Sequence, residues 1–261
     1  AGTQSFGLRE MFGTMTKPFH PGKAAQNGLL AALLVKQGFT SSKQVLEAKR
    51  GFANVYSTES DLSKVLKHWG ETWELEKNTF KPYACGIVLH PAIDACIQLS
   101  QYAIAEEVKE ISLQVHPYVV ELTAKENPKT GLEGKFSIYH SAAIAFLEKD
   151  ASEKQYHEEK INNPKTIELR NKIKPIVNES IEKDNVLARL TKLDGTVHEV
   201  YIEHATGSLQ NPMTESMLHR KFSNLCRDIL SEQQIERIIN GMGHFQQLDS
   251  IHELIDNINS H

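Results

Sequence analysis

Apolar residues recur with a helical period over much of the first hundred residues. Residues 22–36 carry alanines and leucines three or four positions apart, and Gly38 stands where the C-terminus of a helix favours glycine. A second apolar stripe indicates a helix over residues 61–75, and a third helix begins after Pro91. The first part of the chain is therefore predicted to be mostly helical.

The pattern changes to strand-like alternation in the middle of the chain. Residues 108–122 begin with alternating apolar and polar positions, and the runs 186–190 and 197–202 flank an Asp-Gly pair, which favours a β-hairpin. An alanine-rich helix is predicted over 138–147, and an Asn-Pro pair predicts a short helix that ends near Lys172.

Helix-capping residues return near the end of the chain. Thr214 can cap a helix that follows it. Ser231 with Gln234, and Ser250 with Glu253, have the spacing of a capping box. The last fifty residues are therefore predicted to be helical again.

This order of elements predicts an α+β fold with an insertion. We expect a mostly helical domain, incomplete at its N-terminus, whose first part is residues 1–105 and whose last part is residues 208–261. Residues 106–207 would form an inserted α+β lid domain, and clefts between such domains commonly hold small-molecule sites. Residues 1–8 have small residues spaced for close helix contact and are expected to be the middle of a buried helix, although a trimmed terminus is the alternative.

Composition and charge exclude several classes of protein. Of the 261 residues, 40% are hydrophobic and 24% charged, which is ordinary for a globular protein. The net charge of -4 gives no basic excess for nucleic acid, and the longest apolar run, residues 29–35, is too short to cross a membrane. Cys85, Cys96 and Cys226 have no zinc spacing, and so sparse a set favours a reducing compartment. We expect a cytoplasmic protein without a signal peptide.

The first candidate site is the stretch of residues 13–22. Thr14, Thr16, Lys17 and His20 crowd into a loop punctuated by prolines, directly before the expected start of the first helix. Free N–H groups at a helix N-terminus favour an anion, and the lysine adds a positive charge. The alternative is an ordinary capped loop with an exposed lysine.

The second candidate site follows Phe80. Lys81 stands between an aromatic residue and a proline, which is unusual for a fully solvated lysine. Cys85 could be a nucleophile, but without a paired base it is more simply a small buried hydrophobic residue. His90 is more simply a structural or capping residue than a ligand.

A third candidate site is the expected start of the alanine-rich helix. Ser137 and Tyr139 lie there, and a tyrosine hydroxyl could face an anion or supply a proton. The alternative is a half-buried tyrosine whose hydroxyl lies in water. The chain has no phosphate-binding loop, no H-E-x-x-H motif and no iron–sulfur spacing, so a mechanism without metal or cofactor is the default.

These three candidate sites resemble the signature segments of the MmgE/PrpD family. The segments are T-M-T-K-P-F-H-P-G-K-A-A-Q-N-G (14–28), F-K-P-Y-A-C-G-I-V-L-H-P-A-I-D-A (80–95) and G-K-F-S-I-Y-H-S-A-A-I-A-F-L (134–147), in the family's order and spacing. The family includes 2-methylcitrate dehydratase, cis-aconitate decarboxylase and iminodisuccinate epimerase. The resemblance implies a large helical domain with a smaller α+β lid, an active site in the cleft between them, and a homodimer.

The resemblance also implies roles for particular residues. Lys17 and Lys81 match the family's cleft lysines, Tyr139 matches its lid tyrosine, and His20 lies beside the first lysine, so these four are the expected catalytic residues. A further set is expected to bind the substrate, namely Thr14, Thr16, Ser137 and Gly86. No metal or cofactor is implied, and the expected partner is a small polycarboxylate.

Two departures from the family pattern affect the expected reaction. Family members carry a long helical segment before A-G-T-Q-S-F-G-L-R-E, so we expect this chain to be a C-terminal part that lacks some site residues. Some decarboxylases of the family have a histidine where this chain has Gly86, which favours dehydration. The expected reaction removes a proton next to a carboxylate and expels water from a hydroxy acid such as 2-methylcitrate. The alternatives are epimerisation of iminodisuccinate, decarboxylation of cis-aconitate, or an inactive truncated member.

Overall fold

The structure, a computed structural model, describes residues 1–5, 7–248, 250, 252, 255 and 256. The chain forms two compact units, residues 1–78 and 79–261. The second predicted capping box includes Glu253 and therefore lies partly outside the described residues.

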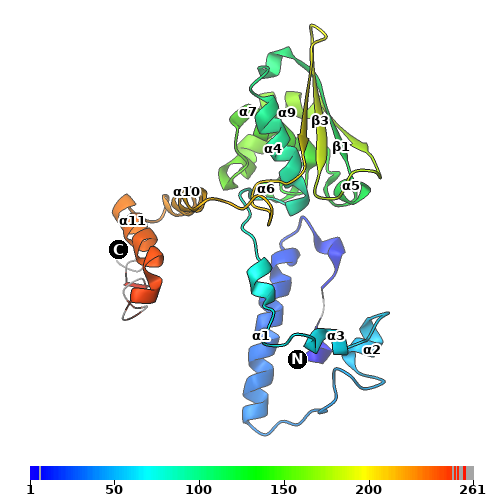
Figure 1. Cartoon of the computed structure of the whole chain (residues 1–261), viewed down its shortest axis with the longest axis vertical. Coiled ribbons are helices and arrows are strands. Elements are labelled where there is room, and N and C mark those ends of the chain that lie inside the picture. The colour runs from blue at the N-terminus through cyan, green and yellow to red at the C-terminus, as the bar shows by residue number, and fades with distance from the viewer. Residues whose placement is uncertain (6, 249, 251, 253–254, 257–261) are drawn as a thin grey trace. The chain divides into compact units, whose positions relative to one another are not determined.

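The first unit is built around one long helix (Figure 1). Its helices are α1 (Thr16–Lys36), α2 (Phe52–Tyr56) and α3 (Ser63–Leu66), with 3-10 turns at Gly2–Gln4, Arg9–Met11 and Glu74–Lys77.

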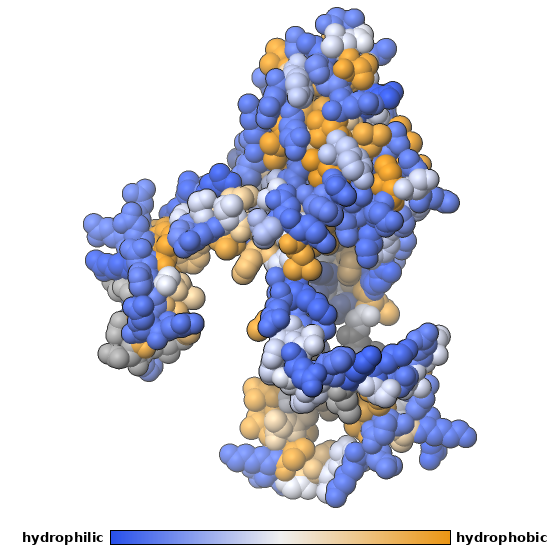
Figure 2. Space-filling view, in the orientation of Figure 1, coloured by the Kyte–Doolittle hydropathy of each residue, from blue (hydrophilic) through white to orange (hydrophobic). Residues whose placement is uncertain are grey.

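Apolar side chains of α1 lie at the surface of this unit. Leu29 is 66% exposed and Leu33 is 52% exposed. Among the described residues of the unit, only Asn27 and Gly51 are buried. Figure 2 shows the resulting hydrophobic surface along the helix. The unit therefore buries little of its own apolar surface.

No helix in the described part of the chain is long and apolar enough to cross a membrane.

The helix predicted over residues 61–75 is wrong in length. Only α3 forms there, because His68 and Gly70 have positive φ angles of 60° and 83°, which interrupt a right-handed helix. Trp69 and Trp73, which belong to the predicted apolar stripe, are exposed.

The second unit combines helices with a sheet. Its strands are β1 (Val108–Val115), β2 (Ile173–Val177), β3 (Val186–Lys192) and β4 (Val197–Ile202). Its helices are α4 (His90–Leu99), α5 (Pro117–Thr123), α6 (Gly131–Gly134), α7 (Ile138–Glu148), α8 (Glu158–Ile161), α9 (Pro164–Asn171), α10 (Glu215–Cys226) and α11 (Glu232–Gly243). Four 3-10 turns are also described, at Ile87–Leu89, Ala105–Glu107, Glu153–Tyr156 and Phe245–Gln247.

The four strands form a mixed sheet in the order β2-β1-β3-β4. Strand β1 pairs parallel with β2 and antiparallel with β3, and β3 and β4 form the predicted hairpin. Gly195 in the hairpin turn has a φ of 88°, which glycine adopts without strain. Helices α4 and α7 pack on the sheet (Figure 1).

The core lies between that face of the sheet and the helices. Along β1, Ile111, Leu113 and Val115 point inward and are buried, whereas Ser112 and Gln114 between them are half-buried on the other face. This alternation follows from the period of two in a strand. Helix α7 contributes small alanines, which allow it to lie close to α4.

The α+β fold class is confirmed, and several elements match their predicted places. Helix α7 covers the alanine-rich run, and the side chain of Asn163 caps α9 by accepting a hydrogen bond from Lys165 N at 2.9 Å. Thr214 caps α10, and Ser231 and Gln234 form the capping box of α11. The lid arrangement and the domain boundaries at 105 and 207 stay predictions.

Candidate functional site

Two hydrogen bonds of Lys81, one from its side chain and one to its backbone, fix the turn that contains it. Lys81 Nζ donates to the carbonyl oxygen of Cys85 at 3.3 Å, and Lys221 Nζ on α10 donates to the carbonyl oxygen of Lys81 at 2.6 Å. Gly207 packs on the same turn with a φ of 85°, and a Cβ there would lie 2.4 Å from the carbonyl oxygen of Phe80. Only glycine permits this approach, so Gly207 helps to position Lys81.

A cavity of about 850 Å³ lies beside this turn. Its wall is formed by the Lys81 turn, the segment 149–155 after α7, and α10. The volume lies in the range of roughly 300–1,000 Å³ that is typical of small-molecule sites. The charged residues of the wall are the cations Lys81, Lys149, Lys154, Arg220, Lys221 and Arg227, and the acids Asp150 and Glu153.

The positive charge of the cavity is only partly neutralised. Glu153 forms an ion pair with Lys135 at 2.6 Å, and Asp150 Oδ1 accepts a hydrogen bond from Ala151 N at 2.8 Å. Within the described part of the chain, no carboxylate lies in ion-pairing range of Lys81 or Lys221. In a chain whose net charge is -4, this local excess of cations favours an anion.

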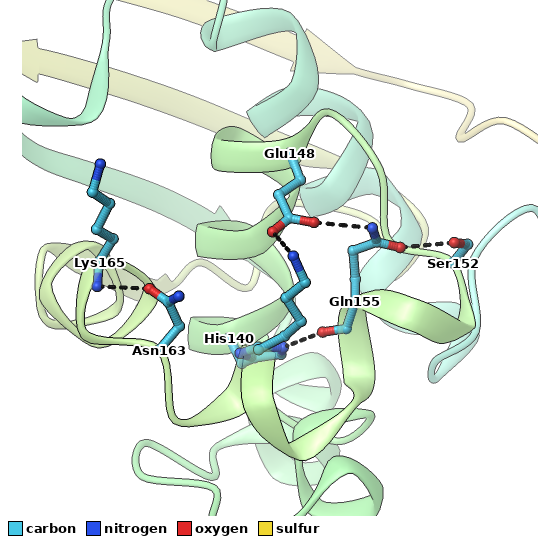
Figure 3. A network of polar contacts seen from close by, with 7 residues as sticks. His140, Glu148, Ser152, Gln155, Asn163 and Lys165 are labelled. Carbon is cyan, nitrogen blue, oxygen red and sulfur yellow. Dashed lines mark hydrogen bonds and ion pairs between the residues drawn. The ribbon is translucent and has the colours of Figure 1, made fainter.

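A polar network fixes the segment that forms one wall of the cavity (Figure 3). His140 Nε2 on α7 lies 3.0 Å from the carbonyl oxygen of Gln155. The side chain of Gln155 donates to Glu148 at 3.0 Å and accepts from Ser152 Oγ at 2.7 Å, while Lys160 Nζ donates to Glu148 at 2.6 Å. The segment is thus tied to the buried helix α7 rather than left as a free loop.

Tyr83 and Asp94 anchor the Lys81 turn to α4. The hydroxyl of Tyr83 donates to Asp94 Oδ1, and the backbone N–H of Thr206 donates to Asp94 Oδ2 at 2.7 Å. Burial, followed by the charge of Asp94, raises the pKa of Tyr83. Tyr83 therefore stays a neutral donor, and the carboxylate joins the Lys81 turn, α4 and the segment at Thr206.

His90 is a buried imidazole behind this wall. Its ring lies edge-on to Tyr83 with the centroids 5.3 Å apart, and its Nε2 has no hydrogen-bond partner among the described residues. Burial, together with the positive charges of Lys81 and Lys221, lowers the pKa of His90 to about 3. The ring is therefore neutral near pH 7, in agreement with the structural role expected from the sequence.

Cys85 lies at the cavity wall but is not an activated nucleophile. The residue is buried, and burial raises the pKa of its thiol to about 12. Lys81 and Lys135 lower the pKa only in part. The thiol is protonated at neutral pH, which agrees with the interpretation of Cys85 as a small buried residue.

Ser137 and Tyr139 begin α7, as the sequence indicates. Ser137 is buried, accepts a hydrogen bond from His140 N at 3.1 Å and donates to the carbonyl oxygen of Lys125 at 2.5 Å. The hydroxyl of Tyr139 donates to Glu126 Oε1 at 3.3 Å. Burial and then Glu126 raise the pKa of Tyr139, which keeps it a proton donor.

Gly86 ends the Lys81 turn in an ordinary extended conformation. Its N–H donates to the carbonyl oxygen of Lys135 at 3.1 Å, and its φ is -61°. A Cβ at this position would meet only that oxygen, at 3.8 Å. Neither backbone strain nor a clash at Cβ requires glycine here.

The first unit holds the remaining candidates, and the loop expected for residues 13–22 is partly wrong. Helix α1 begins at Thr16, so Lys17 and His20 lie within it. Pro18 does not delay the helix to Gly22, because it lies in the first turn, where the N–H that a proline lacks would have no partner in the helix. Pro21 lies inside the helix, which continues past it to Lys36.

The candidate side chains between residues 14 and 20 have different neighbours. Thr14 Oγ1 donates to the carbonyl oxygen of Met11 at 2.7 Å, and Lys17 Nζ lies 5.9 Å from the centre of the Phe12 ring. Thr16 and His20 line a hollow of about 660 Å³ within the first unit.

The structure distributes the predicted site residues over the two units. Among the four candidates of the second unit, all of them described, Lys81 alone lines the large cavity. The convergence of Lys17 and Lys81 on one substrate stays a prediction. Sequence reasoning missed the cations of α10, although the basic pair in its His-Arg-Lys-Phe run is a signal that could have drawn attention to them.

Comparisons with known proteins agree with the resemblance in the sequence. Residues 1–64 match the MmgE/PrpD N-terminal domain, and residues 83–242 match the MmgE/PrpD C-terminal domain. Lys81 lies between the two matched ranges.

Curated relatives of the chain are cis-aconitate decarboxylases. The protein from Homo sapiens is 26% identical over an alignment that covers 90% of this chain and 51% of that relative. The protein from Aspergillus terreus (strain NIH 2624 / FGSC A1156) is 25% identical, with 98% of this chain and 57% of that relative covered. The chain thus spans about half the length of these relatives. Since the two domain matches cover most of the sequence, in order, the chain belongs to the MmgE/PrpD family.

Proposed function

We propose that the protein is a lyase that acts on a small polycarboxylic acid, and that its reaction is the decarboxylation of cis-aconitate. The observation that carries the proposal is the cavity at Lys81, where Lys81 and Lys221 have no carboxylate in ion-pairing range among the described residues. The names of the relatives support the reaction.

The cations suit the charge that such a reaction develops. Loss of CO2 breaks a carbon–carbon bond and leaves its electron pair on the substrate, conjugated with the remaining carboxylates, until a proton quenches it. An ammonium group beside those carboxylates stabilises the growing charge, and its effect is larger in a cavity that excludes water. Lys81 is proposed to bind a carboxylate, and Tyr139 to supply the proton.

The residues of the first unit enter the proposal through the family resemblance. Lys17 is proposed to bind a second substrate carboxylate, with His20 beside it and the hydroxyls of Thr14 and Thr16 as further donors. Ser137 and Gly86 are proposed to shape the substrate site.

Dehydration of a hydroxy acid such as 2-methylcitrate is the second candidate, and Gly86 is the observation that favours it. This reaction removes a proton next to a carboxylate and expels a β-hydroxyl as water, so it develops the same kind of charge. A Cβ fits at position 86 without strain, since the φ is -61° and the nearest atom is 3.8 Å away. The backbone therefore does not require glycine here.

One pair of assays tests the two reactions. The purified protein is incubated with cis-aconitate while released CO2 is measured, and with 2-methylcitrate while the ultraviolet absorbance of the new C=C bond is followed. We expect CO2 release, and we expect Lys81→Ala to reduce it by at least roughly a hundredfold, as for loss of a charged transition-state contact. The exposed Lys174→Ala on β2 is the matched control.

Each result has a defined meaning. CO2 release from cis-aconitate without absorbance from 2-methylcitrate supports the decarboxylase, and the reverse supports the dehydratase. Unchanged rates in Lys81→Ala would remove Lys81 from the proposal. If Gly86 decides the reaction, Gly86→His should increase CO2 release relative to dehydration.

A cytoplasmic homodimer completes the proposal. Cell fractionation checks the location, and light scattering during size-exclusion chromatography checks the assembly.

A further inference from the structure

Lys221 faces the same cavity as Lys81 from a different element. It lies on α10, is partly buried, and lines the cavity. Its ammonium group donates one hydrogen bond, to the carbonyl oxygen of Lys81 at 2.6 Å. Because an ammonium group has three N–H donors, two remain for a ligand.

Geometry links the two lysines: both line the cavity, and Lys221 Nζ lies 2.6 Å from the carbonyl oxygen of Lys81. The positive charges of both also disfavour protonation of the buried imidazole of His90. Two positive charges in one cavity without carboxylate partners repel each other. An anion that contacts both would relieve this repulsion.

A ligand with several carboxylates meets this requirement better than one with a single carboxylate. Lys81 can bind only one carboxylate of such a ligand closely. The ligand's other carboxylates would then lie in a partly enclosed cavity without a positive partner. We propose that Lys221 binds a second carboxylate, remote from the reacting carbon, and that α10 thereby selects polycarboxylates over monocarboxylates. This inference rests on the proposed function, and it adds a specificity-determining residue to it.

The experiment compares ligands that differ in the number of carboxylates. Affinities of the whole protein for propane-1,2,3-tricarboxylate and for butyrate are measured by NMR titration. The variants are Lys221→Gln, Lys221→Arg and Lys81→Gln, with Lys174→Gln on β2 as a control for net charge. Circular dichroism checks that each variant is folded.

We expect the wild type to bind the tricarboxylate more tightly than butyrate. Lys221→Gln should weaken tricarboxylate binding roughly tenfold, the value of one charge-assisted hydrogen bond, and leave butyrate binding unchanged. Lys221→Arg should retain most of the preference, since it keeps the charge. Lys81→Gln should weaken both ligands.

Failure of the inference differs from failure of the proposed function. If Lys221→Gln weakens both ligands equally, Lys221 only positions Lys81 and the inference is wrong. If it weakens neither, Lys221 does not contact the ligand. If the wild type binds no tricarboxylate, or if Lys81→Gln leaves its binding unchanged, the proposed function fails as well.

Discussion

The buried His140 should make the second unit sensitive to acid. Its Nε2 lies 3.0 Å from the carbonyl oxygen of Gln155, so this nitrogen carries the proton of the neutral ring. Its Nδ1 is buried without a partner among the described residues. Protonation would therefore place a charged N–H in the core with no acceptor.

The pKa of His140 gives the size of the effect. The pKa falls from 6.5 to about 4, mainly because the ring is buried; the hydrogen bond to Gln155 acts in the opposite direction, and the charge of Arg170 adds to the effect of burial. Since the unfolded chain binds the proton more readily below pH 6.5, the free energy of unfolding falls as the pH decreases. At about 1.4 kcal/mol per tenfold change, the loss between pH 6.5 and pH 4 is about 3 kcal/mol.

Urea unfolding at a series of pH values measures this loss. Far-ultraviolet circular dichroism is the suitable signal, because both tryptophans lie in the first unit, at Trp69 and Trp73. The variant His140→Gln keeps a neutral N–H donor but does not titrate. We expect the free energy of unfolding of this variant to fall less steeply between pH 6.5 and 4.

The exposed His204 supplies the control. His204→Gln removes a histidine from the surface and should change the slope less than His140→Gln does. If His140→Gln and the wild type lose stability in parallel over this pH range, burial of a neutral His140 is not the source of the acid sensitivity.

Three further predictions concern buried polar groups and thiols. Ser137→Ala should lower the free energy of unfolding by about 1–2 kcal/mol, because it removes the cap of α7, and urea unfolding at pH 7 measures this. Tyr83→Phe should lower the free energy of unfolding by about 1–3 kcal/mol in the same assay, because it removes a hydrogen bond to the buried Asp94. An unchanged urea midpoint would contradict that reasoning. In the folded protein N-ethylmaleimide should label Cys226, which is partly exposed, much faster than the two buried cysteines, whereas in urea mass spectrometry should find all three labelled.

Elements with strong local signals were predictable from the sequence. Asn163 and Thr214 accept hydrogen bonds from N–H groups two and three residues later, so both helix starts depend on neighbouring residues. The hairpin depends on Gly195 in the same way. These contacts join residues that are close in sequence, so the sequence alone predicts them.

Strand β2 was missed for a physical reason. Pro175 lies in its centre, and a proline in an apolar run normally argues against a strand because it cannot donate to a neighbour. Here β2 is an edge strand, so one side of it needs no donor. Its edge position follows from pairing with β1, some sixty residues away, which periodicity does not reveal.

Only the part of the candidate site that lies within one sequence motif could be predicted. Lys81 stands in an unusual Phe-Lys-Pro context and was identified, whereas Lys221, which donates to its carbonyl oxygen, is 140 positions away in the sequence. Nothing in the local pattern of α10 links its basic pair to the Lys81 turn. That link arises only when the segment after β4 folds over the turn at Gly207.

The net charge of the chain did not reveal the site. Which acids form ion pairs with which cations, rather than how many of each there are, decides where positive charge remains unpaired. The chain is acidic overall, yet Glu153 is neutralised by Lys135, and Asp228 lies 3.7 Å from Lys154 at the rim. These pairs remove acids and cations in equal numbers and leave Lys81 and Lys221 without a carboxylate partner among the described residues. A chain with the same composition but a carboxylate placed against Lys81 would show no preference for anions. The arrangement of ion pairs, and not the count of charged residues, therefore carries the argument for a polycarboxylate site.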